Sequence, residues 1–239
     1  MNPTTRTAVV VVGGGPLSER ALAAWAALAG DADDSADAAG IDDAAGSLVV
    51  IAADSGLDHA VAAGIHPQRL VGDLDSISAA GRMWAYANGL SIDERSAAKD
   101  ETDTEIALAT AVAEEDIDRL LVLGGLDRLV DDRLDHLLAT VAALGHPALA
   151  RLSSVRAVLG TSEVVVVHPG HEARLAIDAG QVFSLLALHG SCHGVFLSGA
   201  RWPLAGASLA GHHTRGVSNV AEDDTVVGVA DGIVTVVIP

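Results

Sequence analysis

The sequence predicts two domains, an α/β domain with a mostly parallel, helix-covered sheet at residues 1–155 and an all-β sandwich at residues 156–239. In the first two-thirds of the chain, short and almost continuously apolar runs alternate with stretches of helical period, as in parallel sheets covered on both faces. From about residue 155, short apolar runs are separated by turn residues, and no helical period remains. A chain of 239 residues is long enough for two small domains.

The elements of the first domain are predicted from its apolar runs and from residues that begin and end helices. Strands are expected at residues 8–15, 47–56, 69–73 and 119–125. Helices are expected at residues 18–30, 57–64, 102–115 and 131–145. Ser18 is a suitable N-cap and Gly30 a suitable stop for the first helix. The acidic stretch 31–46 has no apolar period and is expected to be a solvated, mobile insertion.

The second domain is expected to contain strands without helices. Its apolar runs lie between Gly, Pro, Asp and His residues, most of which favour turns. This pattern is typical of a small sandwich or barrel. The strands are expected at residues 163–168, 173–178, 182–188, 193–199, 225–230 and 232–239.

The composition limits the partners and the location of the protein. The formal net charge of −18 argues against nucleic acid, whose phosphates bind basic surfaces. A phosphorylated ligand would need a divalent cation between itself and so many carboxylates. No apolar run reaches the ~18 to 20 residues that span a bilayer, so no membrane partner is expected. The N-terminus is expected to be a strand and not a signal peptide, and the single cysteine, Cys192, makes a reducing cytoplasm the expected location.

The stretch "VGGGPLSER" does not fit the glycine pattern of dinucleotide-binding folds. Ser18 stands where the third glycine would be needed, and Pro16 stiffens the turn. The glycines either let the backbone approach a phosphate closely or make a tight turn, and the sequence favours neither interpretation.

Acidic motifs follow the apolar strands of the first domain. Asp54 follows "VVIAA", and Asp73 and Asp75 follow "RLVG". Because the carboxyl ends of parallel strands share one edge of a sheet, these side chains are expected to converge there. Asp100 and Asp103 lie three residues apart at an expected helix start, so they can share a face.

Any one of these aspartates has a simple structural explanation, because aspartate is a common N-cap and turn residue. A cluster is different, since repulsion between neighbouring carboxylates costs free energy unless a cation compensates it. Carboxylate oxygens favour a hard cation such as Mg²⁺. The sequence therefore predicts a magnesium site, whereas it contains no Cys/His set with zinc spacing.

Other conspicuous residues have both a structural and a functional interpretation. Trp202 could stack on a planar ligand or fill the core of the second domain. His212 and His213 are adjacent, so on an extended backbone they are expected to point apart at the surface. Cys192 beside His193 could form a thiol nucleophile, but an inert cysteine is the commoner case.

Taken in order, six motifs resemble those of the thiamine pyrophosphokinase family. The family patterns A-D-G-G, G-D-x-D-S, K-D-x-T-D-x-E-x-A-L and G-R-x-D-H-x-L-A-N are similar to "ADSG", "GDLDS", "KDETDTEIAL" and "DRLDHLLAT". The C-terminal patterns G-L-x-W-P-L and S-N are similar to "GARWPL" and "GVSN". The resemblance extends over nearly the whole chain in order, which makes it far more specific than any single motif.

The resemblance implies an N-terminal α/β catalytic domain, a C-terminal β-sandwich and a homodimer with active sites between the subunits. It implies that a pyrophosphoryl group moves from ATP to the hydroxyl of thiamine, with Mg²⁺ as cofactor, giving thiamine diphosphate and AMP. The implied metal ligands are Asp73, Asp75 and Asp103. The chemistry of phosphoryl transfer then makes Asp73, Asp103 and Asp100 the expected catalytic carboxylates, with Asp103 or Asp100 accepting the hydroxyl proton.

The resemblance also implies the residues that contact each substrate. Those at ATP and its phosphates are Asp54, Lys99, Thr102, Arg133 and Asp135. Those at thiamine are Trp202, Ser218 and Asn219. A cationic thiazolium ring suits an anionic pocket and the face of a tryptophan.

The sequence departs from the family patterns at a few positions. Ser55 stands at a common glycine and Thr140 at a common asparagine. Asp131 and Asp132 replace the glycines that usually precede the arginine of G-R-x-D-H. These departures concern the local loop conformation and the role of Arg133.

Two other functions fit part of the sequence. "GDLDS" contains the D-x-D pair of haloacid-dehalogenase-like phosphatases, although that family carries its nucleophile on an N-terminal strand and this motif follows the third expected strand. A non-catalytic regulator that binds nucleotide or thiamine would keep the same residues. Release of AMP from ATP in the presence of thiamine separates the kinase from both alternatives.

Overall fold

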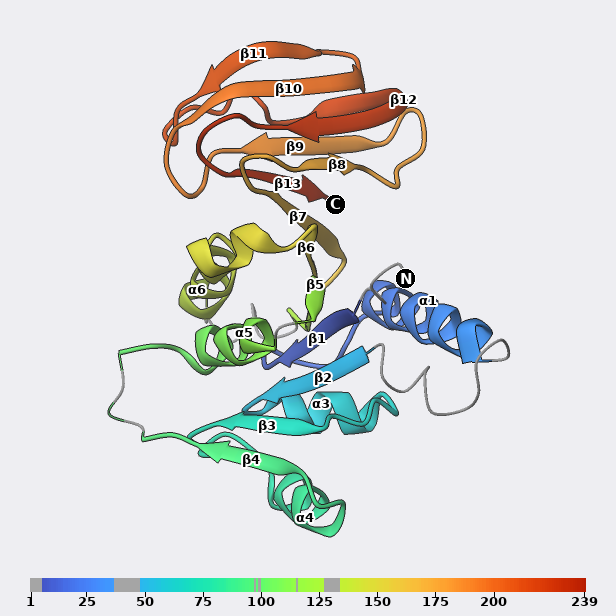
Figure 1. Ribbon diagram of the computed structural model, residues 1–239, viewed down its shortest axis with the longest axis vertical. Helices are drawn as coiled ribbons and strands as arrows, with labels where there is room; N and C mark the ends of the chain where they lie inside the picture. Colours follow the sequence, from blue (N-terminus) through green and yellow to red (C-terminus); the bar gives the residue numbers. More distant parts are fainter. Residues whose placement is uncertain (1–5, 37–47, 97, 99, 115, 127–133) are drawn as a thin grey trace. The chain divides into compact units, whose positions relative to one another are not determined.

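The computed structural model describes residues 6–36, 48–96, 98, 100–114, 116–126 and 134–239 (Figure 1). The chain divides into two compact units, Met1–Ala143 with Ala157–Thr161 (unit 1) and Leu144–Arg156 with Ser162–Pro239 (unit 2). Parallel strands in unit 1 and antiparallel strands in unit 2 combine with helices in a mixed fold. Within the described part, no helix is both long and apolar enough to cross a membrane.

The sheet of unit 1 has parallel strands in the order β5-β1-β2-β3-β4. These strands are β1 (Arg6–Val12), β2 (Leu48–Ala53), β3 (Arg69–Gly72), β4 (Ser91–Glu94) and β5 (Ile117–Gly124). Successive residues of β1, from Ala8 to Val11, are 0% exposed, which shows that both faces of this strand are covered. Strand β6 (Ser154–Leu159) contributes residues to both units.

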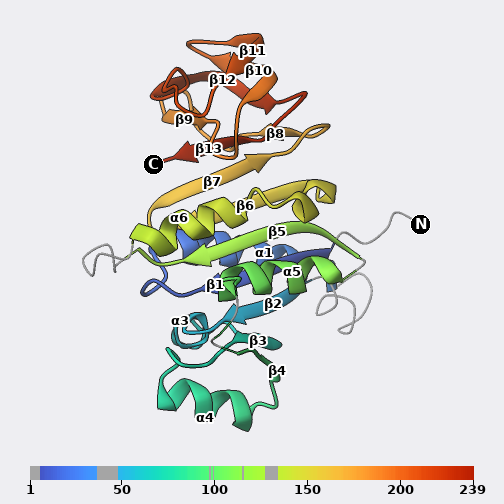
Figure 2. The same ribbon diagram turned by 90° about the vertical axis from the view of Figure 1, so that its left-hand side faces the viewer.

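Helices cover both faces of this sheet. They are α1 (Glu19–Ala36), α3 (Gly56–Ala62), α4 (Ala79–Ala87), α5 (Asp103–Ala113) and α6 (Leu134–Ala143). Helix α5 lies on one face and α1 on the other (Figures 1 and 2). Ala21 of α1 and Ala60 of α3 pack with Val9 and Val11 of β1 in one apolar cluster.

The predicted end of the first helix at Gly30 is wrong, because α1 continues to Ala36. An interior glycine costs a helix only about 1 kcal/mol relative to alanine, which is too little to end it when the next residues can extend the ladder. The rest of the predicted insertion, residues 37–46, lies outside the described residues.

Unit 2 is built from antiparallel strands around one apolar cluster. They are β7 (Ser162–Val167), β8 (Glu172–Arg174), β9 (Val182–Leu186), β10 (Cys192–Ala200), β11 (Leu204–Leu209), β12 (Asn219–Gly228) and β13 (Val234–Ile238). Their order is β7-β13-β9-β12-β10-β11, and β8 pairs with β12. Phe183, which is 0% exposed, lies in the cluster with Val195, Val227 and Val236. A 3₁₀ helix, η2 (Pro147–Arg151), also belongs to this unit.

Candidate functional site

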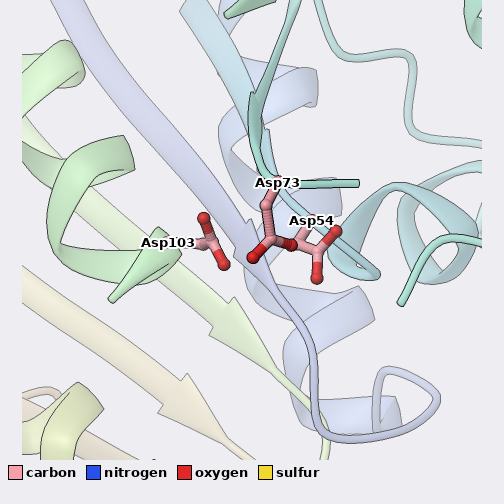
Figure 3. Close-up of side chains that lie close together, drawn as sticks. All are labelled: Asp54, Asp73 and Asp103. Atoms are coloured by element: carbon pink, nitrogen blue, oxygen red, sulfur yellow. The ribbon is translucent and has the colours of Figure 1, made fainter. Parts of the chain in front are cut away.

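Three carboxylates meet at the edge of the unit 1 sheet where its strands end. Asp54 directly follows β2, Asp73 directly follows β3, and Asp103 is the first residue of α5. One oxygen from each side chain lies within 4.8 Å of the other two, and Figure 3 shows the three carboxylates pointing toward one another. Asp54 and Asp73 therefore converge at this edge as expected, and Asp103 joins them from the helix, whereas Asp75 is not part of the group.

The loop after β3 has a backbone that turns sharply around Asp73. Gly72 has a φ of 148°, and a Cβ on it would lie 3.1 Å from both Asp103 Oδ1 and the Asp54 Cβ. Leu74 has a φ of 62° and is only 2% exposed, because its side chain packs in the apolar cluster beneath the loop. The Arg82 guanidinium of α4 donates a hydrogen bond to the Leu74 carbonyl. Glycine is thus required at 72, and Leu74 anchors the loop that presents Asp73.

Asp54 is the most buried member of the cluster. Its φ is 47°, its backbone N–H donates to the Val71 carbonyl at 2.9 Å, and its carbonyl accepts from Leu57 N–H at 3.0 Å. The Ser76 hydroxyl donates a hydrogen bond to Asp54 Oδ2. Asp54 Oδ1 is shielded from solvent and has no hydrogen-bond partner among the described residues. A buried carboxylate oxygen without a partner is costly unless something else binds it.

The electrostatic environment opposes ionisation of Asp54. Burial is the main cause that raises the pKa of its carboxyl above the ordinary value, and the hydrogen bond from Ser76 acts in the opposite direction. The negative charges of Asp103, Asp73 and Asp75 raise the pKa of Asp54 further. The folded protein therefore holds this carboxylate in a place that disfavours its charge, and a bound cation would relieve that cost.

The cluster fits a hard divalent cation. Its donors are three carboxylate oxygens from rigid strand and helix ends, the ligand type that Mg²⁺ prefers in proteins. Asp54 Oδ1 adds a buried oxygen to which no residue in the described part of the chain donates a hydrogen bond. Among the described residues, no group of histidines or cysteines lies close enough together to form another metal site.

Several residues implied at the phosphate site lie outside this cluster. Asp75 and Asp100 are exposed, and neither belongs to the close group of three. The expected shared helical face of Asp100 and Asp103 is absent, because α5 begins only at Asp103. Thr102 is the N-cap of α5, and its Oγ1 accepts from Glu105 N–H at 3.2 Å.

Asp135 lies exposed in the first turn of α6, with its Oδ2 3.9 Å from His136 Nε2. Thr140, where the family has asparagine, is buried on the same helix. Lys99 and Arg133 lie outside the described residues, as do Asp131 and Asp132.

The departure at Ser55 is accommodated by a neighbouring glycine. Ser55 has a φ of −58°, so no special backbone freedom is needed there. A Cβ on Gly13, at the end of β1, would lie 2.5 Å from Ser55 Oγ. The glycine therefore leaves the space that the serine hydroxyl uses. A Cβ on Gly14 would lie 2.5 Å from the Gly125 carbonyl oxygen, so close backbone packing explains part of the glycine run.

The residues implied at thiamine meet in unit 2. The buried Asn219 side chain binds the backbone of Trp202 twice, accepting from its N–H at 3.2 Å and donating to its carbonyl at 2.8 Å. Ser218, with a φ of 60°, donates its N–H to Ser184 Oγ at 3.1 Å. The Trp202 side chain is 56% exposed, so it does not fill the core of this unit. The Arg201 guanidinium lies 5.8 Å from the centroid of its ring.

The remaining sequence candidates have structural explanations. His212 and His213 are exposed as expected, but their rings do not point apart, because they pack edge to face with centroids 4.5 Å apart in a turn. Cys192 is fully buried, and burial raises the pKa of its thiol. Its Sγ donates to the Ile233 carbonyl at 3.0 Å, while His193 bonds Ser208, so these two residues do not form a nucleophilic pair.

Ser76 and Arg82 are the residues around the cluster that the sequence did not single out. Ser76 is the last letter of "GDLDS", so its motif was recognised but its contact with Asp54, 22 residues away, was not. No local pattern signals the Arg82 contact, because it depends on how α4 packs beside the loop.

Comparison with known proteins gives the same family for both parts of the chain. The profile "Thiamin pyrophosphokinase, catalytic domain" matches residues 44–155, and "Thiamin pyrophosphokinase, vitamin B1 binding domain" matches residues 170–234. No curated protein matches the chain in a sequence search.

Solved structures of thiamine pyrophosphokinases share the fold at low sequence identity. The Bacillus subtilis protein has 22% identity and a TM-score of 0.72, with 98% of each chain covered. The Enterococcus faecalis family protein has 18% identity and a TM-score of 0.69, again with 98% of each chain covered. The Candida albicans protein has 13% identity and a TM-score of 0.68, and the match covers 98% of this chain and 89% of that one.

Proposed function

Because the chain belongs to the thiamin pyrophosphokinase family and is an enzyme that forms thiamine diphosphate, we propose that it transfers pyrophosphate from ATP to thiamine and releases AMP, with Mg²⁺ as cofactor. The observation that carries the metal-dependent part of this proposal is the cluster of Asp54, Asp73 and Asp103. A triphosphate cannot approach such a cluster in an acidic protein unless positive charge lies between them.

The proposed metal ligands are Asp73 and Asp103, with Asp54 added to them because its buried Oδ1 has no hydrogen-bond partner among the residues that the structure describes. Asp75, the third ligand expected from the family resemblance, lies one residue beyond Leu74 and stays a proposal. When bound, Mg²⁺ would neutralise negative charge that develops on the phosphates during transfer. The protein contributes a rigid set of oxygens at fixed separations.

Transfer needs one proton acceptor and a cationic cradle for the phosphates. The thiamine hydroxyl oxygen bonds to the β-phosphorus of ATP, the bond from that phosphorus to the bridging α–β oxygen breaks, and AMP leaves. Asp103 or Asp100 would take the hydroxyl proton. Lys99 and Arg133 are proposed to bind the triphosphate, with contributions from Thr102 and Asp135.

Thiamine is proposed to bind at Trp202, Ser218 and Asn219. The exposed Trp202 ring offers a face to a planar cationic thiazolium, and Asn219 fixes the backbone that carries it. Arg201 already lies over the ring at 5.8 Å, so a bound thiazolium would use the free face or displace that side chain.

The organisation implied by the family also remains part of the proposal. It comprises an α/β catalytic domain at residues 1–155, a β-sandwich thiamine-binding domain at residues 156–239, and a homodimer with active sites at the subunit interface. A cytoplasmic location is supported by the single buried cysteine.

The assay that tests this function is the identity of the nucleotide product. Purified protein with ATP, Mg²⁺ and thiamine should release AMP and form thiamine diphosphate in equal amounts, and omission of thiamine should stop both. ADP as the only product, or no ATP consumption, would refute the assignment. A phosphoenzyme trapped on Asp73 would support a phosphatase instead, and a tight ATP–Mg–thiamine complex without turnover would support a regulator.

A further inference from the structure

The loop that carries Asp73 also carries a residue that contacts the buried member of the carboxylate cluster. The Ser76 hydroxyl donates a hydrogen bond to Asp54 Oδ2, and no other side-chain hydrogen bond to Asp54 is present among the described residues. The other oxygen of the same carboxylate, Oδ1, is buried, and no described residue forms a hydrogen bond to it. The two oxygens of Asp54 are therefore in different situations, one held by the protein and one left unsatisfied.

We propose that Ser76 is a positioning residue that fixes the Asp54 carboxylate, so that Oδ1 stays available to a divalent cation shared with Asp73 and Asp103. The proposal rests on the metal site of the proposed function. It assigns to Ser76 no contact with either substrate and no ligand role of its own.

Ser76 can act in this way because the loop is anchored on both sides of it. Leu74 and Ile77 are 2% and 7% exposed, and both pack in the same apolar cluster. The Arg82 guanidinium holds the Leu74 carbonyl, and Ser78 N–H donates to Asp58 Oδ2 at 2.8 Å. The position of Ser76 is therefore set by the packing of the loop and of α4.

Asp54 needs such a partner because its backbone alone does not fix its carboxylate. The backbone is held by hydrogen bonds to Val71 and Leu57, which leave the side-chain torsions free. The neighbouring carboxylates of Asp73 and Asp103 repel Asp54 at separations within 4.8 Å. Without the hydroxyl of Ser76, rotation of Asp54 away from the cluster would relieve that repulsion and remove one ligand oxygen from its place.

The direct test is metal binding by the full-length protein without substrates. Mn²⁺ serves as the probe, and its free concentration is followed by electron paramagnetic resonance. Ser76→Ala should weaken Mn²⁺ binding about 10-fold or more, the usual effect of removing a hydrogen-bond partner of a ligand. Ser76→Thr keeps the hydroxyl and should bind within about 2-fold of wild type. Ser78→Ala is the matched control and should bind Mn²⁺ like wild type, because the Ser78 hydroxyl in the same loop bonds Asp58 and caps α4 at Gly81 N–H without contacting Asp54.

A double-mutant cycle tests whether Ser76 acts through Asp54. In the Asp54→Ala background, Ser76→Ala should cause little further loss of Mn²⁺ affinity, because the side-chain oxygens that Ser76 holds are already gone. If Ser76→Ala weakens Mn²⁺ binding in that background as much as it does in wild type, the proposal is overturned and Ser76 acts on the metal independently of Asp54. Wild-type affinity in Ser76→Ala would also overturn it. If the wild-type protein binds no Mn²⁺, the metal site of the proposed function is refuted. That result differs from equal Mn²⁺ binding by wild type and Ser76→Ala, which refutes only the role of Ser76.

Discussion

Replacing Asp54 with asparagine is expected to stabilise the metal-free protein and to remove its stabilisation by Mg²⁺. Asparagine has nearly the same shape and tolerates the left-handed backbone of residue 54, whose φ is 47°. Its side-chain oxygen can still accept the hydrogen bond from Ser76. The substitution therefore removes one negative charge from the cluster and changes little else.

The expected magnitude is worked out from the separations in the cluster. At 4.8 Å, the upper limit between the ligand atoms, two unit charges repel by about 0.9 kcal/mol in bulk water and about 3.5 kcal/mol at an effective dielectric constant of about 20. Neutralising Asp54 removes its repulsion with both Asp73 and Asp103, which is about 2 kcal/mol even at the bulk-water limit. For a chain of this size, about 2 kcal/mol raises the melting temperature by roughly 4–8 °C.

Thermal unfolding at pH 8, in EDTA and in excess Mg²⁺, measures both effects. The melting temperature of the wild-type protein should be higher in Mg²⁺ than in EDTA. The Asp54→Asn protein should have a higher melting temperature than wild type in EDTA, and Mg²⁺ should raise it little further. Asp178→Asn is the matched control, because Asp178 is an exposed aspartate in a turn of unit 2. The reasoning is refuted if the Asp54→Asn protein melts at or below wild type in EDTA, or if it keeps the full Mg²⁺ shift.

Two further predictions concern unit 2. Burial lowers the pKa of His168 and His189 below the usual 6.5, so their contribution to stability is complete above about pH 6.5 and is lost as the pH falls below it. The urea midpoint should therefore drop between pH 7.5 and 5.5, and His168→Asn should reduce that drop. Asn219→Ala removes two hydrogen bonds to the Trp202 backbone, so it should lower unfolding free energy by about 1–3 kcal/mol and raise the KM for thiamine.

The central strands could be predicted because their apolar runs are nearly continuous. Strands β1, β2, β3 and β5 were expected from apolar runs such as "AVVVV" and "LLVLG", which are buried on both faces. Helix α4 was not predicted, because the large apolar residues Met83 and Tyr86 lie on its exposed side and interrupt the helical pattern of apolar residues. Strand β11, "LAGASL", consists largely of small, exposed residues, and its pairing with β10 alone makes it a strand.

The candidate site was predictable in outline and not in detail. The rule that parallel strands end at one edge was enough to bring Asp54 and Asp73 together, but it also placed Asp75 with them and did not place Asp103, which begins a helix. It could not separate Asp73 from Asp75, because their different surroundings depend on the left-handed Leu74 between them. A positive φ at leucine has no sequence signal, since it is held by tertiary packing.

Backbone strain supports the functional interpretation of the motifs independently of the carboxylates. Among the described residues, positive φ outside glycine occurs at Asp54, Leu74 and Ser218. These three lie in "ADSG", "GDLDS" and "GVSN", the motifs assigned to the metal and thiamine sites. Each such conformation costs about 1–2 kcal/mol relative to an ordinary backbone, and a glycine would remove most of that cost. The side chains kept at the first two positions have different roles: Asp54 belongs to the carboxylate cluster, whereas Leu74 packs beneath the loop that carries Asp73.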